Sequence, residues 1–321
     1  MPLLNLKSLC KGLDGGDWAG FMRDWDRSLR AANHPETTRY NYLLPVAQLA
    51  RYLRSPESEY AGSAAALDPT AVKKRHVESF QSWMIETRSA STALNKHKGL
   101  QQFFKWLVAE GEMDAHPMVR VPQPKCEKKL IPVMRDDETK KLLDFVRAKK
   151  DFSAIRDEAL IRLYYNTGAR LSEIGNLLLT DVDMNTQSIH VHGKGAKDRR
   201  VRFGTKTARA LSVYLRARAK KRYADEIPQL WMAERGKVAL TPNGIKLMLK
   251  RRGQRAGLGH VHAHRWRHNF AHEWKLAGGN TGDLMLLLGW SSEDMPRHYG
   301  ASAAAERAQE LQTQMGIGEK I

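Results

Sequence analysis

A proline-rich basic stretch near the middle of the sequence most limits how this chain can fold. The stretch contains the prolines Pro117, Pro122, Pro124 and Pro132 and the lysines Lys125, Lys128 and Lys129. Proline cannot continue a helix, and a run rich in proline behaves as a stiff, extended spacer. We therefore predict a helical domain over residues 1–112, a linker over 113–135, a second domain over 136–300 and a tail over 301–321.

The residues before the linker have the period of amphipathic helices. Large apolar side chains recur at helical spacing in residues 18–29, 35–53, 68–83 and 91–109. Asp68 and Pro69 form a typical helix start, because aspartate caps a helix and proline fits its first turn. The sequence predicts a four-helix bundle whose aromatic side chains are core, with a polar loop at residues 55–67.

The second part is also helical, with one interruption by a β-hairpin. Residues 136–146, 155–165 and 205–222 have a helical period, and Thr241-Pro242 starts a further helix. Residues 188–192 and 199–203 alternate instead, and glycine-rich residues 193–197 form the turn between them. The predicted fold class is therefore mainly α with a small β-sheet, as a helical bundle plus a mixed α/β domain.

The net charge of +18 indicates a polyanionic partner. Residues 1–135 carry +6 and residues 136–321 carry +12, so both parts are expected to contact that partner. Charge alone does not distinguish a nucleic-acid-binding protein from other basic proteins. The basic linker either lies along the phosphate backbone of a nucleic acid or is a solvated tether. The candidate contacts, each also explicable as a solvated cation, are Arg39, Lys96, Lys98, Lys250, Arg251 and Arg252.

Cysteine usage and hydropathy indicate a cytoplasmic protein without a membrane partner. Cys10 and Cys126 form neither a disulfide framework nor a metal-ligand spacing. The first residues are too short and polar for a signal peptide, and no apolar run approaches the roughly 18 residues of a membrane span.

Two arginine motifs and a late tyrosine suit attack on a phosphodiester. Arg170 lies in the motif of residues 167–173 (TGARLSE), and Arg267 follows His264 by three residues on the same predicted helix face. A guanidinium group fits the non-bridging oxygens of phosphate, and tyrosine is a competent nucleophile when a base and a positive field assist it. Taken singly, each residue is more often structural.

In order and spacing, residues 17–305 resemble the tyrosine recombinases of the phage-integrase, Xer and Cre type. The matching motifs are the first arginine box at 155–174, the lysine hairpin at 192–199, the His-x-x-Arg box at 264–271, and the final box and nucleophile at 286–290 and 297–299. Trp290 stands where many members have histidine, which keeps a hydrogen-bond donor but removes a titratable group.

The resemblance implies a role for each motif residue. Arg170 and Arg267 would hold the scissile phosphate, and Glu173 would orient Arg170. The other implied roles are removal of the nucleophile's proton by His264, protonation of the departing 5′ oxygen by Lys194 in preference to Lys197, donation to phosphate by Trp290, and nucleophilic attack by Tyr299.

The resemblance further implies a two-domain C-shaped clamp on double-stranded DNA, with a core-binding bundle and a catalytic domain. The expected activity is site-specific recombination through a 3′-phosphotyrosine intermediate and a Holliday junction, by a homo-tetramer with no cofactor. Accessory DNA-bending or directionality proteins are further expected partners, and the tail either docks on a neighbouring protomer, folds back on its own subunit or is a frayed end. An integrase of a phage or mobile element is our first expectation.

Other functions remain open at this point. The chain could be a Xer-like resolvase of chromosome or plasmid multimers, a DNA-binding protein without strand-transfer activity, or a type IB topoisomerase. The histidines His262, His264, His268 and His272 suggest a metal site, but the run has no His-Glu-x-x-His motif and no carboxylate or thiolate partner. We therefore expect no metal there and interpret His268 and His272 as packing residues or as residues that support the catalytic side chains without contacting substrate.

Overall fold

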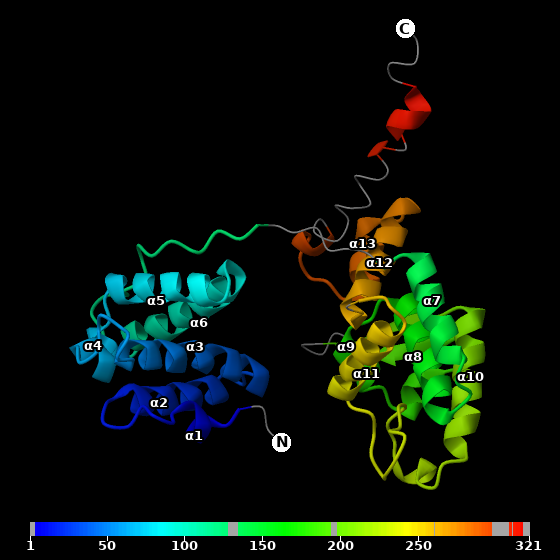
Figure 1. The fold of residues 1–321 in the computed structure, drawn as a ribbon, viewed down its shortest axis with the longest axis horizontal. Helices are drawn as coiled ribbons and strands as arrows, with labels where there is room; N and C mark the ends of the chain where they lie inside the picture. The colour runs from blue at the N-terminus through cyan, green and yellow to red at the C-terminus, as the bar shows by residue number, and fades with distance from the viewer. Residues whose placement is uncertain are drawn as a thin grey trace. The chain divides into compact units, whose positions relative to one another are not determined.

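The computed structural model describes residues 4–127, 134–193, 198–259, 261–296, 308–309 and 311–316. The chain forms two compact units, Met1–Lys128 and Lys129–Ile321, each with its own hydrophobic core (Figure 1). The division falls inside the predicted linker at 113–135, whose ends remain a prediction. The predicted fold class, mainly α with a small sheet, is confirmed.

The first unit is a helical bundle. Its elements are α1 (Leu6–Leu9), α2 (Trp18–Ala31), α3 (Glu36–Arg54), α4 (Ala64–Leu67), the 3-10 turn η1 (Pro69–Ala71), α5 (Lys74–Thr87) and α6 (Ala90–Ala109). The four helices predicted from periodicity correspond to α2, α3, α5 and α6. Helices α3 and α6 pack closely because Gly99 has no side chain, since a Cβ there would lie 2.7 Å from Pro45.

Two details of the first unit differ from the prediction. Asp68 caps η1, where its carboxylate accepts a hydrogen bond from the backbone N–H of Thr70 at 2.7 Å, and the helix starts again only at Lys74. Trp83 is 37% exposed, although we expected the aromatic side chains to be core. Spacing predicts the face of a helix, but it does not say how wide the buried part of that face is.

The second unit is built around one buried helix. Its elements are α7 (Asp136–Arg147), α8 (Phe152–Thr167), α9 (Leu171–Gly175), η2 (Leu179–Asp181), β1 (Val182–Asp183), β2 (Ser188–Val191), β3 (Arg199–Arg202), α10 (Thr205–Ala219), η3 (Ala224–Glu226), α11 (Pro242–Arg255), α12 (Ala263–Leu276) and α13 (Thr281–Leu288). Helix α8 packs against α7, α10 and α12, which explains why it is buried on most sides. The helix predicted at Thr241-Pro242 is α11, and the Thr241 hydroxyl caps it.

The two paired strands of the predicted β-hairpin are confirmed, while residues 194–197 of its predicted turn lie outside the described residues. Strands β1, β2 and β3 form an antiparallel sheet in that order, with Ile189 opposite Val201. Ile189 and Val191 are fully buried, so His190 lies on the other face of β2, and His192 directly follows the strand.

The predicted tail at 301–321 lies largely outside the described residues. Its described part, residues 308–309 and 311–316, is helical up to residue 315, and Leu311 and Met315 are exposed there. No helix in the described part of the chain combines the length and apolar character that crossing a bilayer requires.

Candidate active site

A glycine turn positions the first of the predicted arginines. Helix α8 ends at Gly168, whose φ of 58° lies in the left-handed region and whose missing Cβ would come within 2.8 Å of Phe270. The chain then extends to Arg170, which precedes the short helix α9. Glu173 in α9 accepts the backbone N–H of Arg170 at 2.7 Å, as in a capping box. This turn fixes the position of the Arg170 Cα and therefore the region that its side chain can reach.

Glu173 joins two arginines from different elements. Its carboxylate accepts hydrogen bonds from the Arg170 guanidinium at 2.8 Å and from the Arg199 guanidinium at 3.1 and 2.9 Å. Burial alone would raise the pKa of Glu173, but hydrogen bonds from Arg199 and then Arg170 outweigh it and lower that pKa to about 2. The carboxylate is therefore ionised near neutral pH and orients both cations.

The C-terminal end of α13 collects three arginines on three successive carbonyls. Gly289 adopts a φ of 61° and ends the helix, while backbone N–H groups take the carbonyls of Met285 and Leu286. Each of the next three carbonyls accepts a hydrogen bond from one arginine. Arg199 donates to Leu287 at 2.6 Å, Arg267 to Leu288 at 2.6 Å and Arg170 to Gly289 at 3.0 Å. The negative end of the helix dipole thus gathers the cations.

Arg267 lies at the centre of this arginine cluster, which we define as Arg170, Arg199 and Arg267. It is 1% exposed, donates to the Gly168 carbonyl at 3.0 Å, and its guanidinium lies 5.1 Å from the ring centroid of Trp290. The Trp290 ring is itself 7% exposed. Segments about a hundred residues apart in the sequence therefore meet at one place.

The other predicted catalytic residues are placed less completely. His264, in the first turn of α12, is exposed, whereas Arg267 on the same helix is buried. That both side chains act on the same phosphate therefore remains a prediction. Lys194 and Tyr299 lie outside the described residues. His268 and His272 are 3% and 4% exposed, which agrees with their interpretation as packing residues.

The candidate DNA contacts divide into paired and exposed cations. The Arg39 guanidinium donates to Asp26 at 2.6 Å, and Arg252 donates to Asp157 through two nitrogens at 3.0 and 2.8 Å. Both side chains are largely buried, at 14% and 12% exposure, so these two arginines have structural partners. The exposed candidates are Lys98, Lys250 and Arg251, while Lys96 is half-buried and its pKa is lowered by that burial.

Arg199 is a member of the cluster that the sequence reasoning missed. It was noted only as part of the hairpin motif. The alternation of β3 contained the signal, because Arg199 shares a strand face with Val201, which is 2% exposed. An arginine on the buried face of a strand requires a partner, and here Glu173 supplies it.

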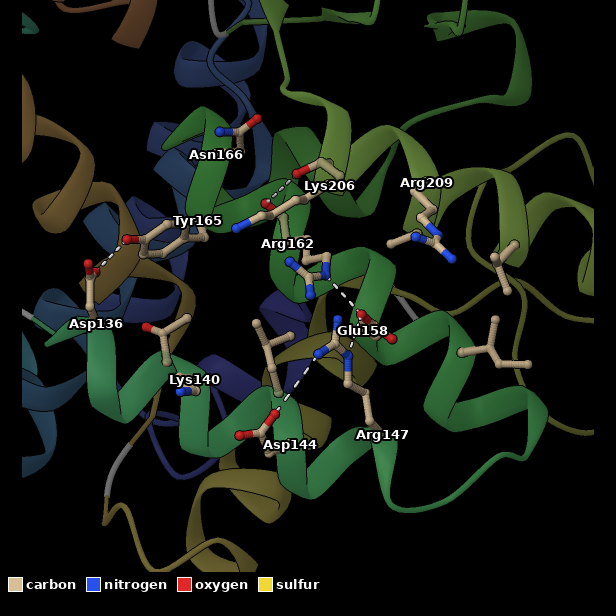
Figure 2. Close-up of a pocket in the computed structure, with 16 residues that line it drawn as sticks. Asp136, Lys140, Asp144, Arg147, Glu158, Arg162, Tyr165, Asn166, Lys206 and Arg209 are labelled. Atoms are coloured by element: carbon tan, nitrogen blue, oxygen red, sulfur yellow. Dashed lines mark hydrogen bonds and ion pairs between the residues drawn. The ribbon is translucent and has the colours of Figure 1, made fainter.

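A separate hollow of about 850 Å³ lies among α7, α8 and α10 (Figure 2). Several of its charged side chains are paired with each other, since Arg147 and Arg162 both donate to Glu158 at 2.8 Å and the Tyr165 hydroxyl donates to Asp136 at 2.5 Å. None of the predicted catalytic residues that the structure describes lines it. We therefore assign it no part in the chemistry.

Comparison with known proteins identifies the relationship that this geometry suggests. Residues 132–306 match the phage integrase family, and residues 21–111 match the phage integrase N-terminal SAM-like domain. The chain belongs to the phage integrase family. Its relatives include tyrosine recombinase XerC of Azotobacter vinelandii, 36% identical over 64% of this chain and 67% of the relative, and XerC of Salmonella typhi, 32% identical over 65% and 68%.

Solved structures support the fold of this family member. The XerH site-specific recombinase bound to palindromic difH substrate gives a TM-score of 0.70 at 20% identity, covering 90% of this chain and 82% of XerH. A lambda integrase dimer bound to a core site gives 0.67 at 14% identity, covering 88% and 76%. The protein is a tyrosine recombinase, an enzyme of site-specific DNA cleavage and rejoining, and the prediction of that activity is confirmed.

Proposed function

We propose that this recombinase works through a 3′-phosphotyrosine intermediate with Tyr299 as the nucleophile. The proposal rests on one observation: Arg170 and Arg267 both donate to carbonyls at the end of α13, those of Gly289 and Leu288. Tyr299 follows these two residues by ten and eleven positions in the sequence. Two guanidinium groups at one place supply the positive field that an oxygen nucleophile needs against a phosphodiester.

Cleavage of the strand exchanges one phosphate ester bond for another. The Tyr299 oxygen bonds to phosphorus while the bond from phosphorus to the 5′ oxygen breaks. His264 takes the tyrosine proton, and Lys194 gives a proton to the departing 5′ oxygen. Arg170, Arg267 and the indole N–H of Trp290 stabilise charge on the non-bridging oxygens. A 5′-hydroxyl from a second duplex then reverses the step, which passes through a Holliday junction and needs no cofactor.

Glu173 and Arg199 have positioning roles in this proposal. Glu173 contacts both Arg170 and Arg199, and Arg199 also binds the end of α13. The guanidinium of Arg170 is therefore held before substrate arrives, and a preorganised donor costs no reorganisation in the transition state. Arg199 acts through Glu173 and is not itself assigned to the phosphate.

We propose that double-stranded DNA is the partner of both units, through the exposed cations Lys98, Lys250 and Arg251. The XerH and lambda integrase structures named above contain DNA, which supports this partner. Assembly as a tetramer, docking of the tail on a neighbouring protomer, accessory proteins and a cytoplasmic location belong to the same proposal.

Two biological roles follow from the same chemistry. The XerC relatives favour resolution of chromosome or plasmid multimers, whereas the breadth of the phage integrase family keeps integration of a mobile element as the other role. A plasmid-dimer resolution assay with sites recovered from covalent complexes separates them, because an integrase would join two different sites instead of resolving two equal ones.

The nucleophile is tested with a suicide substrate whose cut strand cannot religate. We expect the wild-type protein to form a covalent adduct that survives detergent, and Tyr299→Phe to form none, since the phenyl ring has no oxygen to attack with. Tyr223→Phe serves as a control tyrosine outside the cluster. An adduct formed by Tyr299→Phe would remove Tyr299 from the mechanism.

A further inference from the structure

Two histidines and an aspartate meet at the base of the β2–β3 hairpin, outside the arginine cluster. His190 lies on the face of β2 opposite to Ile189, His192 directly follows the strand, and Asp181 ends the neighbouring turn η2. One potential ligand atom from each residue lies within 4.8 Å of the other two. The imidazole rings are 4.6 Å apart between centroids. The groups face the same small volume.

The two best-placed ligand atoms already have the spacing of a zinc site. The Asp181 Oδ1 and the His192 Nε2 are 3.2 Å apart. In a tetrahedral site with bonds of about 2.0 Å, neighbouring ligand atoms are about 3.3 Å apart. Rotation of the His190 side chain would bring in the third ligand, because that ring is only partly buried.

Each of these two ligands is oriented by a second contact. The other Asp181 oxygen, Oδ2, accepts the backbone N–H of Leu178 at 2.8 Å, which leaves Oδ1 directed at His192. The His192 Nδ1 lies 3.0 Å from an oxygen of Asp198. Histidines that bind zinc generally donate their second ring N–H to such a carboxylate, which fixes the tautomer and the ring orientation.

We propose that Asp181, His190 and His192 bind a zinc ion, with Asp198 orienting His192. Three nitrogen and oxygen ligands with an open fourth position suit Zn²⁺. The ion takes no part in the strand-transfer chemistry, for which the arginine cluster and the nucleophile are proposed. The site therefore adds a metal-binding property to the recombinase.

The position of the site suggests what the ion would do. In the sequence, His192 precedes Lys194 by two residues and Asp198 follows it by four. A bound ion would tie the two residues that flank the Lys194 segment to η2. This consequence rests on the proposed role of Lys194, whereas metal binding itself does not.

The same contacts have a metal-free explanation, in which a protonated His192 bridges Asp181 and Asp198. That bridge does not need His190, whose nearest carboxylate contact is 3.7 Å to Asp198. Substitution of His190 therefore separates the two explanations, because it removes a metal ligand and leaves the bridge intact.

The test is titration of the purified, full-length recombinase with ZnCl₂ by calorimetry, without DNA, at about pH 8, because zinc and protons compete for the same ligands. All proteins carry Cys126→Ser, so that the exposed thiol does not bind zinc. We expect one ion per chain, and a loss of about tenfold or more in affinity for His190→Gln, His192→Gln and Asp198→Asn. His34→Gln, at an exposed histidine of the first unit, should bind as before.

Zinc binding that is absent, or that is unchanged by His190→Gln, would overturn the proposal. A second measurement does not depend on the variants. Zinc should slow cleavage by trypsin after Lys194 and Lys197 in the Cys126→Ser protein, and His190→Gln should abolish that protection. Loss of strand cleavage in Lys194→Gln together with normal zinc binding would show that the site and the proposed chemistry are separate.

Discussion

The second unit contains two clusters of the same composition that do different work. Glu173 accepts hydrogen bonds from Arg170 and Arg199, and Asp157 accepts them from Arg156 and Arg252. In the Asp157 cluster the side chains are 0–12% exposed, whereas the Arg170 side chain is 39% exposed beside a Glu173 that is 3% exposed. We call Asp157 with Arg156 and Arg252 the closed cluster, because its side chains are shielded from solvent. We call Glu173 with Arg170 and Arg199 the open cluster, because Arg170 is accessible to a ligand.

The difference shows how to distinguish a structural ion pair from a candidate binding site. A buried charge that is fully paired has no donors to offer, and removing one partner leaves an uncompensated charge. A partly exposed guanidinium that is held from one side keeps its remaining N–H groups directed at solvent. Composition alone would have treated the two clusters alike.

The largest stability effect is expected in the closed cluster. Asp157→Asn should lower the free energy of unfolding by about 3–5 kcal/mol, because it leaves two buried guanidinium groups without a counter-charge. Urea denaturation followed by circular dichroism measures this. The control is Asp183→Asn, whose exposed carboxylate lies 3.9 Å from Arg200 and which should change stability by no more than about 1 kcal/mol. Equal effects of both substitutions would contradict the comparison.

Arg170→Lys should show the opposite pattern in the open cluster. A lysine keeps the charge but loses the fork that contacts Glu173 and phosphate together, so we expect strand cleavage to fall by about 10²–10³-fold. Stability should change little, because Arg170 is partly exposed. Single-turnover cleavage and urea denaturation on the same preparations test both statements. A protein that unfolds easily but cleaves normally would place Arg170 among the structural residues.

Arg199 sharpens the comparison because it acts only through its neighbours. Burial is the largest influence on the pKa of Glu173 and raises it, and the side-chain hydrogen bond from Arg199 is the largest of those that lower this pKa to about 2. In the wild-type protein, the ionised Glu173 stabilises the folded state, and this contribution is lost as the pH falls from about 4.5 to 2. In Arg199→Gln the pKa of Glu173 should move towards its ordinary value of 4.5, so the contribution is smaller and is lost at higher pH. Acid denaturation should therefore begin at a higher pH in the variant.

Strand cleavage distinguishes a positioning role from a structural one at Arg199. We expect Arg199→Gln to lower the cleavage rate by about tenfold, a size typical of residues that orient a functional group without contacting the ligand. Arg199→Lys should restore part of that rate. Normal cleavage in Arg199→Gln together with the shifted acid denaturation would limit Arg199 to a structural role.

Local sequence patterns predicted most of the elements but not how their ends meet. Helical spacing located α2, α3, α6 and α8, and strand alternation located β2 and β3, because each pattern repeats within one element. The contacts of Arg199 with Glu173 and with Leu287 join segments 26 and 88 residues apart. Such contacts depend on how whole elements pack, which no local period contains.

The site residues show the same limit. Motif order was sufficient to select Arg170, Glu173 and Arg267, which the structure brings to one place. Each cation of the run at residues 250–252 is a predicted DNA contact, but neighbouring residues of a helix point in different directions. Arg252 therefore reaches the buried Asp157, while Lys250 and Arg251 remain exposed.

The smallest expected effect is a difference between Lys250 and Arg252, both on α11, in how DNA affinity depends on salt concentration. If Lys250 contacts a DNA phosphate, Lys250→Gln should reduce the slope of log affinity against log salt by about 1. Arg252→Gln should leave the slope unchanged while lowering thermal stability, because its guanidinium is engaged by Asp157. Fluorescence anisotropy with one labelled duplex at several salt concentrations, below the melting temperature of both variants, measures the slopes. A reduced slope in Arg252→Gln alone would mean that the closed cluster opens onto DNA, and the contrast between the two clusters would then be lost.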